Sequence, residues 1–405
     1  MQVVFDFIKH KTYVFLILLL AVFVGVFAGL VCAVFGRGLL FLDALRVSHP
    51  LFFIPFLGIA GILIVSAYKS WGGSSAEGVS LIFEVGYGEK PSVPKRIIPF
   101  IIISTWISNL FGASVGREGV AIQIGAALGF RVGKIFRNDR IARILLIAGI
   151  AGGFGGLFRT PIAAVFFALE VLVAGSLAYE AFLPSLITAF TASFVSGKLG
   201  VPMETILMDA EISFTAGNIF RIVIASLAFC MVGRIFSTAD KKMRLLLQKI
   251  LPNDCVRIFI VGLAISIASI ALYRGRYSGL SLGITDAVFH GGKVYAWDWI
   301  LKIVFTVISL SAGFQSGEIS PLLCIGSSFG YVFAGIVKLP PVLCAAMGSA
   351  SVLGSATNTF LAPMFIGCEV FGFKYLPYFF ITCAIAYACN GNNTIYGKQR
   401  LSSML

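Results

Sequence analysis

GREGVAIQIGAALG at residues 116–129 and GEISPLLCIGSSFG at residues 317–330 are the two stretches that decide the fold. Aligned at a constant offset, Gly125 and Gly129 fall opposite Gly326 and Gly330. A second pair follows in the same order, PIAAVFFALEV at residues 161–171 and PMFIGCEV at residues 363–370. Each half thus repeats a glycine-rich turn, a short helix and a helix that runs from proline to Glu-Val. This order predicts two structural repeats in one chain.

The composition around these stretches requires a lipid environment. Of the 405 residues, 58% are hydrophobic and 12% are charged, and the mean hydropathy is +0.96. A helix needs about 20 apolar residues to cross a bilayer. Runs that approach or exceed this length predict an all-α polytopic membrane protein, and they cover residues 13–36, 50–68, 217–237, 255–273 and 377–389.

Other apolar segments are expected to be too short, or too interrupted by glycine, to cross alone. Such segments in matching positions of two halves are typical of inverted-repeat transporters with broken and re-entrant helices. We therefore expect one transmembrane transport domain over residues 1–405, with repeats at about 10–200 and 215–400 and no soluble regulatory domain. The segments concerned are residues 119–129, 144–157, 321–336 and 341–354.

The net charge of +13 could suggest nucleic acid, but the basic residues gather in short connections. That distribution follows the positive-inside rule, so we expect these connections to be cytoplasmic and expect no nucleic-acid partner. The three histidines lie near segment ends and the eight cysteines show no CxxC spacing, which predicts neither a metal site nor a cofactor. The connections contain Arg131, Lys134, Arg137, Arg140 and Arg143, then Lys241, Lys242, Arg244, Lys249 and Arg257.

Three glycine-rich turns predict an anion site within the membrane. They lie around Gly78, Gly116 and Gly317, each just before an apolar segment. The first turn of a helix presents unpaired N–H groups and the positive end of the helix dipole, which together bind anions. Converging helix N-termini without fixed cations would bind a small anion and still release it, which suits a transport pathway.

Glu118 lies in the second of these turns. As a carboxylate it would compete with the anion for the same N–H groups, and as a neutral acid it would withdraw. An ionisable group at membrane depth indicates function by default, so a gate and a proton carrier are both plausible. The alternative is a glutamate that only caps its helix.

With these residues in place, the sequence resembles the CLC family of chloride channels and transporters. GREGV at 116–120 looks like the family's GREGP, FRTPIAAVFFALEV at 158–171 resembles its FNAPLAG…E helix, and GFQSGEISPLL at 313–323 resembles its GxxGGxFxP turn. The resemblance implies inverted repeats, a homodimer, one ion pathway per subunit and a multi-pass place in the cell membrane, here a bacterial inner membrane.

The resemblance also implies roles for individual residues. Glu118 would be the gating glutamate, and Tyr396 would turn its hydroxyl toward the central anion, although an interfacial belt tyrosine is the alternative. It stays open whether Ser320, Asn392, Asn393 and Thr394 touch the ion or only satisfy backbone groups. The expected anion-binding positions are Gly78, Val79, Gly116, Arg117, Gly119, Gly317, Ile319, Ser320 and Tyr396.

Departures from the chloride-type pattern indicate the branch. Val79 replaces the serine of the family's GSGIP motif, unless the register shifts and Ser80 is the ligand. Glu318 stands where an apolar residue is usual, and near an anion it should be protonated or hydrogen-bonded, able to donate to fluoride. Val171 follows Glu170 where chloride/proton antiporters carry an inner proton glutamate. Glu170 itself should serve structure at a helix end.

These departures favour a fluoride/proton antiporter that exports fluoride, with Glu118 and Glu318 as the two functional carboxyls. The alternative is a chloride channel or chloride/proton antiporter of the same fold. A third possibility, an intramembrane enzyme, would need a nucleophile with its base or a metal-binding acidic cluster in the apolar segments. Neither pattern occurs, so we expect no enzyme.

Overall fold

The computed structural model describes the backbone of residues 2–402 and the side chains of residues 14–402. Its α-helices are α1 (Gln2–Ser48), α2 (Pro50–Phe53), α3 (Leu57–Ala67), α4 (Val79–Tyr87), α5 (Ile97–Leu110), α6 (Glu118–Lys134), α7 (Asp139–Phe158), α8 (Pro161–Glu170), α9 (Phe182–Lys198), α10 (Ala216–Ile250), α11 (Asp254–Ala271), α12 (Leu282–Phe289), α13 (Asp298–Ala312), α14 (Ile319–Val337), α15 (Pro341–Thr357), α16 (Leu361–Phe371) and α17 (Leu376–Ala388). Short 3-10 or π turns lie at Ile54–Phe56, Tyr68–Gly72, Gly73–Glu77, Tyr179–Ala181, Tyr273–Gly275 and Phe373–Tyr375. The strands β1 (Val173–Ala174) and β2 (Arg400–Leu401) form one parallel pair.

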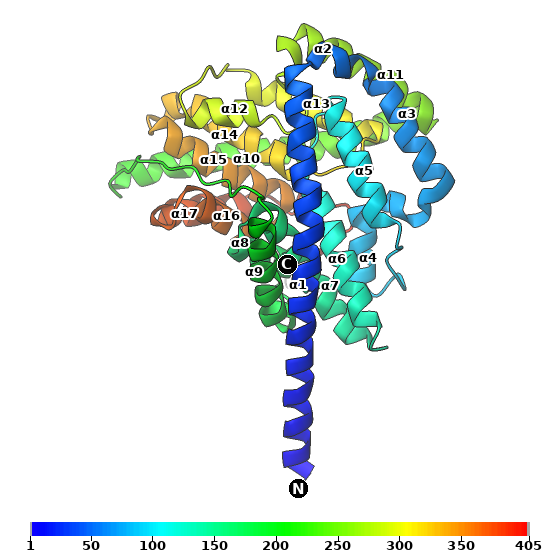
Figure 1. Cartoon of the computed structure of the whole chain (residues 1–405). Coiled ribbons are helices and arrows are strands. Elements are labelled where there is room, and N and C mark those ends of the chain that lie inside the picture. The colour runs from blue at the N-terminus through cyan, green and yellow to red at the C-terminus, as the bar shows by residue number, and fades with distance from the viewer. Residues whose placement is uncertain (1, 403–405) are drawn as a thin grey trace.

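The described helices confirm the helical membrane class. Six segments are long and apolar enough to cross a membrane, and four of the five predicted runs fall within or largely overlap them. The run at 377–389 instead forms α17, whose 13 residues are fewer than a full crossing requires. In Figure 1, α1 stands as a long helix beside the others, and its N-terminal end projects beyond them.

The expectation of short, glycine-interrupted segments is wrong for two of the four. α7 and α14 are continuous helices of 20 and 19 residues, long enough to cross. Glycine costs a helix only about 1 kcal/mol relative to alanine, and tight tertiary packing outweighs that cost here. α6 and α15, with 17 residues each, are also uninterrupted.

The glycines of these helices serve close packing. A Cβ added at Gly125 or Gly149 would overlap the backbone carbonyl of the other residue, so α6 and α7 touch backbone to backbone. Gly326 of α14 and Gly348 of α15 exclude each other's Cβ in the same way. Small residues let membrane helices approach to this distance. The equivalent pairs support the proposal of two repeats.

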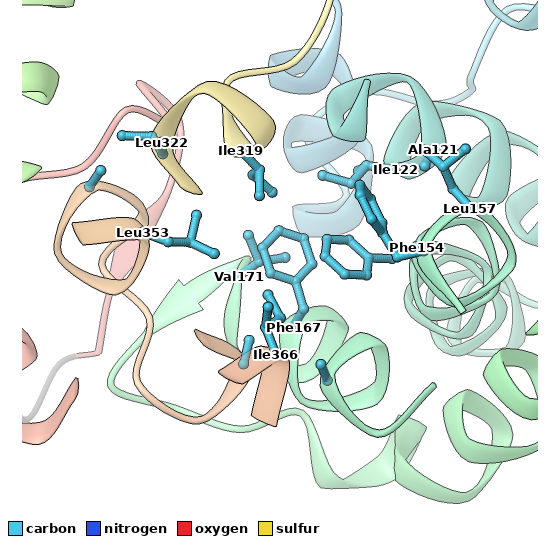
Figure 2. Packing of buried hydrophobic residues seen from close by; sticks show 14 of the residues in the cluster. Ala121, Ile122, Phe154, Leu157, Phe167, Val171, Ile319, Leu322, Leu353 and Ile366 are labelled. Atoms are coloured by element: carbon cyan, nitrogen blue, oxygen red, sulfur yellow. The ribbon is translucent and has the colours of Figure 1, made fainter. Parts of the chain in front are cut away.

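The core lies where helices from both halves of the chain meet. Figure 2 shows Phe154 and Phe167 from the first half pointing toward Ile319 and Leu353 from the second. The rings of Phe154 and Phe167 stack with centroids 5.0 Å apart. This apolar centre holds α6 and α14, which carry the two principal glycine turns, against one another.

Candidate functional site

The site begins where the N-termini of three helices converge. Gly78 adopts φ +60° immediately before α4, a conformation that favours glycine. Gly116 and Gly317 form an isolated antiparallel bridge, in which Gly116 N donates to Gly317 O at 2.6 Å. A Cβ at Gly119 would lie 3.5 Å from Val79 Cγ2, so the start of α4 adjoins that of α6. The three turns predicted from sequence therefore meet.

Close approach explains why glycine is required at this junction. A Cβ at Gly317 would lie 2.5 Å from Gly119 N and 2.8 Å from Glu118 N. Any larger residue would push α14 away from α6. Because these glycines have no side chains, the N–H groups at the starts of α6 and α14 can come close together. This arrangement of helix N-termini binds anions.

Glu118 is fully buried, and its carboxylate lies among these N-termini. Oε2 accepts a hydrogen bond from Arg117 N at 2.9 Å, and Oε1 accepts one from the Ser320 hydroxyl. The carboxylate therefore holds donors from the start of α6 and from α14 at once. An anion would need these same donors, so Glu118 and an anion exclude each other there.

The Arg117 side chain turns away from this junction. Its guanidinium forms an ion pair with Glu204 and lies 5.0 Å from the centroid of the Phe158 ring. Only the Arg117 backbone N–H faces Glu118. Among the predicted anion-binding positions, Arg117 thus brings a main-chain donor rather than its charge.

A cavity of about 580 Å³ leads away from the junction. Val79, Glu318 and Tyr396 line it together with Ser80, which adjoins Val79 in the first turn of α4. The cavity wall also includes the basic residues Lys241, Arg244 and Lys398. Tyr396 is 7% exposed and its ring lies 5.4 Å from that of Phe83, so it faces the interior rather than a lipid interface.

The polar residues before Tyr396 satisfy neighbouring protein groups. Asn393 Nδ2 donates to Asn390 O at 3.2 Å. The Thr394 hydroxyl donates to Thr357 O at 3.4 Å and accepts from Tyr396 N at 3.1 Å. Asn392 has a φ of +60°, which places it in a turn. Asn393 and Thr394 thus hold the segment that carries Tyr396, and Ser320 contacts Glu118.

Glu170 has the structural role expected of it. Its carboxylate accepts from Phe360 N, Leu361 N and Ala362 N, at 2.7–3.2 Å, around the start of α16. Glu369 of α16 accepts in return from Ile162 N and Ala163 N at the start of α8. The two helices therefore cap each other reciprocally. The sequence analysis did not name Glu369. Its position in the second Glu-Val pair, equivalent to Glu170 in the first, could have indicated its capping role.

Lys302 is a site residue that the sequence analysis missed. It is fully buried on α13 and donates to Ser114 Oγ and Gly279 O, both at 2.8 Å, and to Tyr277 O at 3.3 Å. Its cation fixes the loop before Gly116 to the loop before α12. A lysine inside the apolar segment 298–312 is the signal that could have found it.

The chain matches a family model described as "Voltage gated chloride channel" over residues 56–391. A protein of Pseudomonas syringae pv. tomato named "Chloride/fluoride channel protein" is 35% identical over 392 residues, covering 95% of this chain and 86% of that protein.

Solved structures share the fold. A CLC-type fluoride/proton antiporter superposes with a TM-score of 0.94 at 44% identity, covering 96% of this chain and 98% of the other. A slow cyanobacterial Cl⁻/H⁺ antiporter superposes with a TM-score of 0.79 at 19% identity, covering 94% and 96%. At that identity, the second likeness concerns the fold alone.

Proposed function

The chain belongs to the CLC family of chloride channels and transporters, and from that premise we propose that it exchanges fluoride for protons. The observation that carries the proposal is the Glu118 carboxylate, buried among converging helix N-termini and bound by Arg117 N and Ser320 Oγ. The close similarity to a CLC-type fluoride/proton antiporter supports the choice of ions.

In this proposal Glu118 is both the gate and the proton carrier. The ionised carboxylate occupies the N–H groups and blocks the anion. Once protonated, the Glu118 side chain loses its negative charge and binds those hydrogen-bond donors more weakly. It then swings away, and the anion takes its place. Because each swing carries a proton one way and admits an anion the other way, one residue couples the two movements.

In this proposal, the residues that select fluoride over other halides are those that line the cavity next to the helix N-termini. Val79 offers no hydroxyl to a larger halide at the first turn of α4. Glu318, in its neutral form, donates a hydrogen bond to fluoride, the halide that accepts such bonds most strongly. Tyr396 lines the same cavity and brings a second hydroxyl. Gly78, Gly116, Gly119, Gly317 and Ile319 contribute backbone at the helix starts.

We further propose a homodimer in the cell membrane of a bacterium, with the cavity that Glu318 lines open to the cytoplasm. Lys241, Arg244 and Lys398 lie in the wall of that cavity, and cytoplasmic segments carry an excess of such residues.

The experiment is ion flux from liposomes that contain the pure protein and are loaded with fluoride or chloride. Fluoride efflux and internal pH are followed together. We expect fluoride efflux to be accompanied by proton uptake into the vesicles. Rapid chloride efflux without a pH change would instead establish a chloride channel, the alternative that the family also includes.

A further inference from the structure

An acidic residue outside the gate lines the same cavity as Glu318. Asp240 is the only acidic residue of α10 and is 3% exposed. It lines the cavity together with the basic residues Lys241 and Arg244 and with Glu318. No inner acid is available on α8, because Val171 follows Glu170 and the Glu170 oxygens are bound to α16.

The Asp240 carboxylate is only half satisfied. Oδ2 accepts from Arg244 at 3.3 Å, and Oδ1 is buried without a hydrogen-bond partner. The Arg244 side chain is 48% exposed, so the ion pair is weakened by solvent. A buried acceptor without a partner destabilises the folded protein, which a residue kept for stability alone would not require.

Asp298, another buried aspartate, makes the contrast clear. It is 0% exposed, and its oxygens accept from the Tyr277 hydroxyl at 2.7 Å, from the Arg276 guanidinium at 2.7 and 3.2 Å and from Tyr295 N at 2.9 Å. That carboxylate is fully used in holding the fold together. Asp240 keeps one oxygen that no protein group uses.

A second unpartnered acceptor lies in the same cavity wall. Gln123 is 2% exposed, and its Nε2 donates to Gly119 O at 3.0 Å, one residue from the gate. Its Oε1 has no partner. The cavity wall therefore has an acceptor without a partner on α6, the helix that begins with Glu118. Glu318 lines the same cavity as Asp240, and Ser320, two residues after Glu318, contacts the Glu118 carboxylate.

We propose that Asp240 is the inner proton-exchanging group of this antiporter, an inference that rests on the proposed function. A proton brought inward on the Glu118 carboxyl passes to the Glu318 carboxylate, and Glu118 becomes a carboxylate again. Glu318 passes the proton to the Asp240 carboxylate, and Asp240 releases it to a cavity water, which leaves as hydronium. Each acid returns to its starting form, and the sequence runs backward for outward transfer.

The charged surroundings suit an exchanging acid. Lys241 and Arg244 flank Asp240 on α10, Glu318 faces it from α14, and Lys398 and Glu77 line the same cavity from the tail and from the turn before α4. The nearby cations stabilise the carboxylate after release, and Glu318 opposes it.

The test is Asp240→Asn in fluoride-loaded liposomes, with proton uptake and fluoride efflux recorded together. We expect proton uptake per fluoride to fall at least about tenfold, and Asp240→Glu to restore it. Asp240→Asn with wild-type proton uptake per fluoride would overturn the inference while leaving the antiporter intact. Fluoride efflux without proton uptake in the wild-type protein would instead overturn the proposed function.

Two further variants separate proton exchange from a structural role. Arg244→Gln breaks the same ion pair and removes one nearby cation but keeps the acid, so it should retain most of the proton uptake per fluoride that Asp240→Asn loses, and a loss equal to that of Asp240→Asn would overturn the inference. Asp254→Asn removes an aspartate that pairs with Lys69 and Arg257 outside this cavity, and it serves as the charge control.

If Asp240→Asn fails to give a single peak in size-exclusion chromatography, Asp240→Glu decides the question. Its rate of proton uptake is then measured over a range of internal pH. A pH profile shifted from that of the wild type supports proton exchange at residue 240. An unshifted profile overturns it, because a purely structural carboxyl would change the amount of folded protein and not the pH dependence.

Discussion

At the scale of single residues, the chemistry proposed for this protein depends on one carboxyl group. Glu118 can act as a gate because its oxygens already hold donors from two helix starts, Arg117 N and Ser320 Oγ. The same contact would be a simple helix cap in a soluble protein. At membrane depth, an exchangeable carboxylate in an anion site couples the charge of the proton to that of the anion.

Glu118→Gln should abolish proton coupling. The amide mimics the neutral acid and cannot carry a proton, so fluoride efflux should proceed with no accompanying proton uptake in loaded liposomes. Glu180→Gln, an exposed carboxyl in the pair with Arg140, should leave coupling unchanged as the control. Unimpaired coupled exchange in Glu118→Gln would remove the central proposal.

Val79→Ser should admit chloride more readily. The new hydroxyl can donate to the larger halide at the first turn of α4, and one hydrogen bond to a charged group changes affinity roughly tenfold. The measurement is the ratio of chloride to fluoride efflux. Val79→Ala, which removes bulk without adding a donor, should keep the wild-type ratio. If Val79→Ser keeps it as well, position 79 does not set selectivity.

At the scale of helices, the two halves of the chain are joined by hydrogen bonds between the ends of α8 and α16. Glu170 caps α16, and Glu369 caps α8, so each helix of the pair needs the other's carboxylate. Because buried N–H groups at a helix start have no water to bond with in a membrane protein, these carboxylates are structural in a way that surface caps are not.

Glu170→Gln tests this role directly. The amide keeps a single acceptor oxygen for the backbone N–H groups around the start of α16, so the free energy of unfolding should fall by about 1–3 kcal/mol. Thermal unfolding in detergent measures the loss, with Glu180→Gln as the exposed control. Proton uptake per fluoride should stay at the wild-type value, and a loss of coupling would mark Glu170 as a proton carrier instead.

Gly125→Ala should separate α6 from α7. The added methyl group would overlap Gly149 O, and overpacking of this kind costs about 1–3 kcal/mol. Since α6 carries Glu118 at its start, transport should fall together with the thermal unfolding temperature. Gly335→Ala is the matched control, because nothing lies within 4 Å of a Cβ at that position. Equal behaviour of the two variants would contradict the packing argument.

At the scale of the whole molecule, the C-terminal segment closes the cavity by binding to both halves. Gln399 Nε2 donates to Val171 O at 3.0 Å and to Thr357 O at 3.1 Å. β2 pairs with β1, and Lys398 forms an ion pair with Glu84 at 2.8 Å. Tyr396 therefore reaches the cavity only when the two halves are docked around this segment.

Gln399→Ala should disturb Tyr396 without unfolding the protein. Two hydrogen bonds to buried carbonyls are lost, each contributing about 0.5–1.5 kcal/mol, so fluoride exchange should fall up to roughly tenfold and the free energy of unfolding should fall by about 1–3 kcal/mol, with the protein still folded. Liposome flux and thermal unfolding are measured on the same preparation. Gln248→Ala, an exposed residue of α10, is the control. Wild-type flux in Gln399→Ala would show that the tail does not position Tyr396.

The sequence by itself determined the helical membrane class, the turns at Gly78, Gly116 and Gly317 and the family. These features are local, because hydrophobicity over about 20 residues and glycine before a helix act within one segment. Even the structural role of Glu170 followed from its place at a helix end. The proposed halide and the role of Glu118 also followed from local motifs.

Only the tertiary structure decided how these segments meet. It showed that the glycines of α7 and α14 pack helices together rather than interrupt them, and that the Arg117 side chain turns toward Glu204. It also placed the Lys302 ammonium against Ser114, in the loop before Gly116, and Asp240 in the cavity that Glu318 lines. Such contacts join residues far apart in the chain, and their energies depend on burial and on partners that no single segment contains.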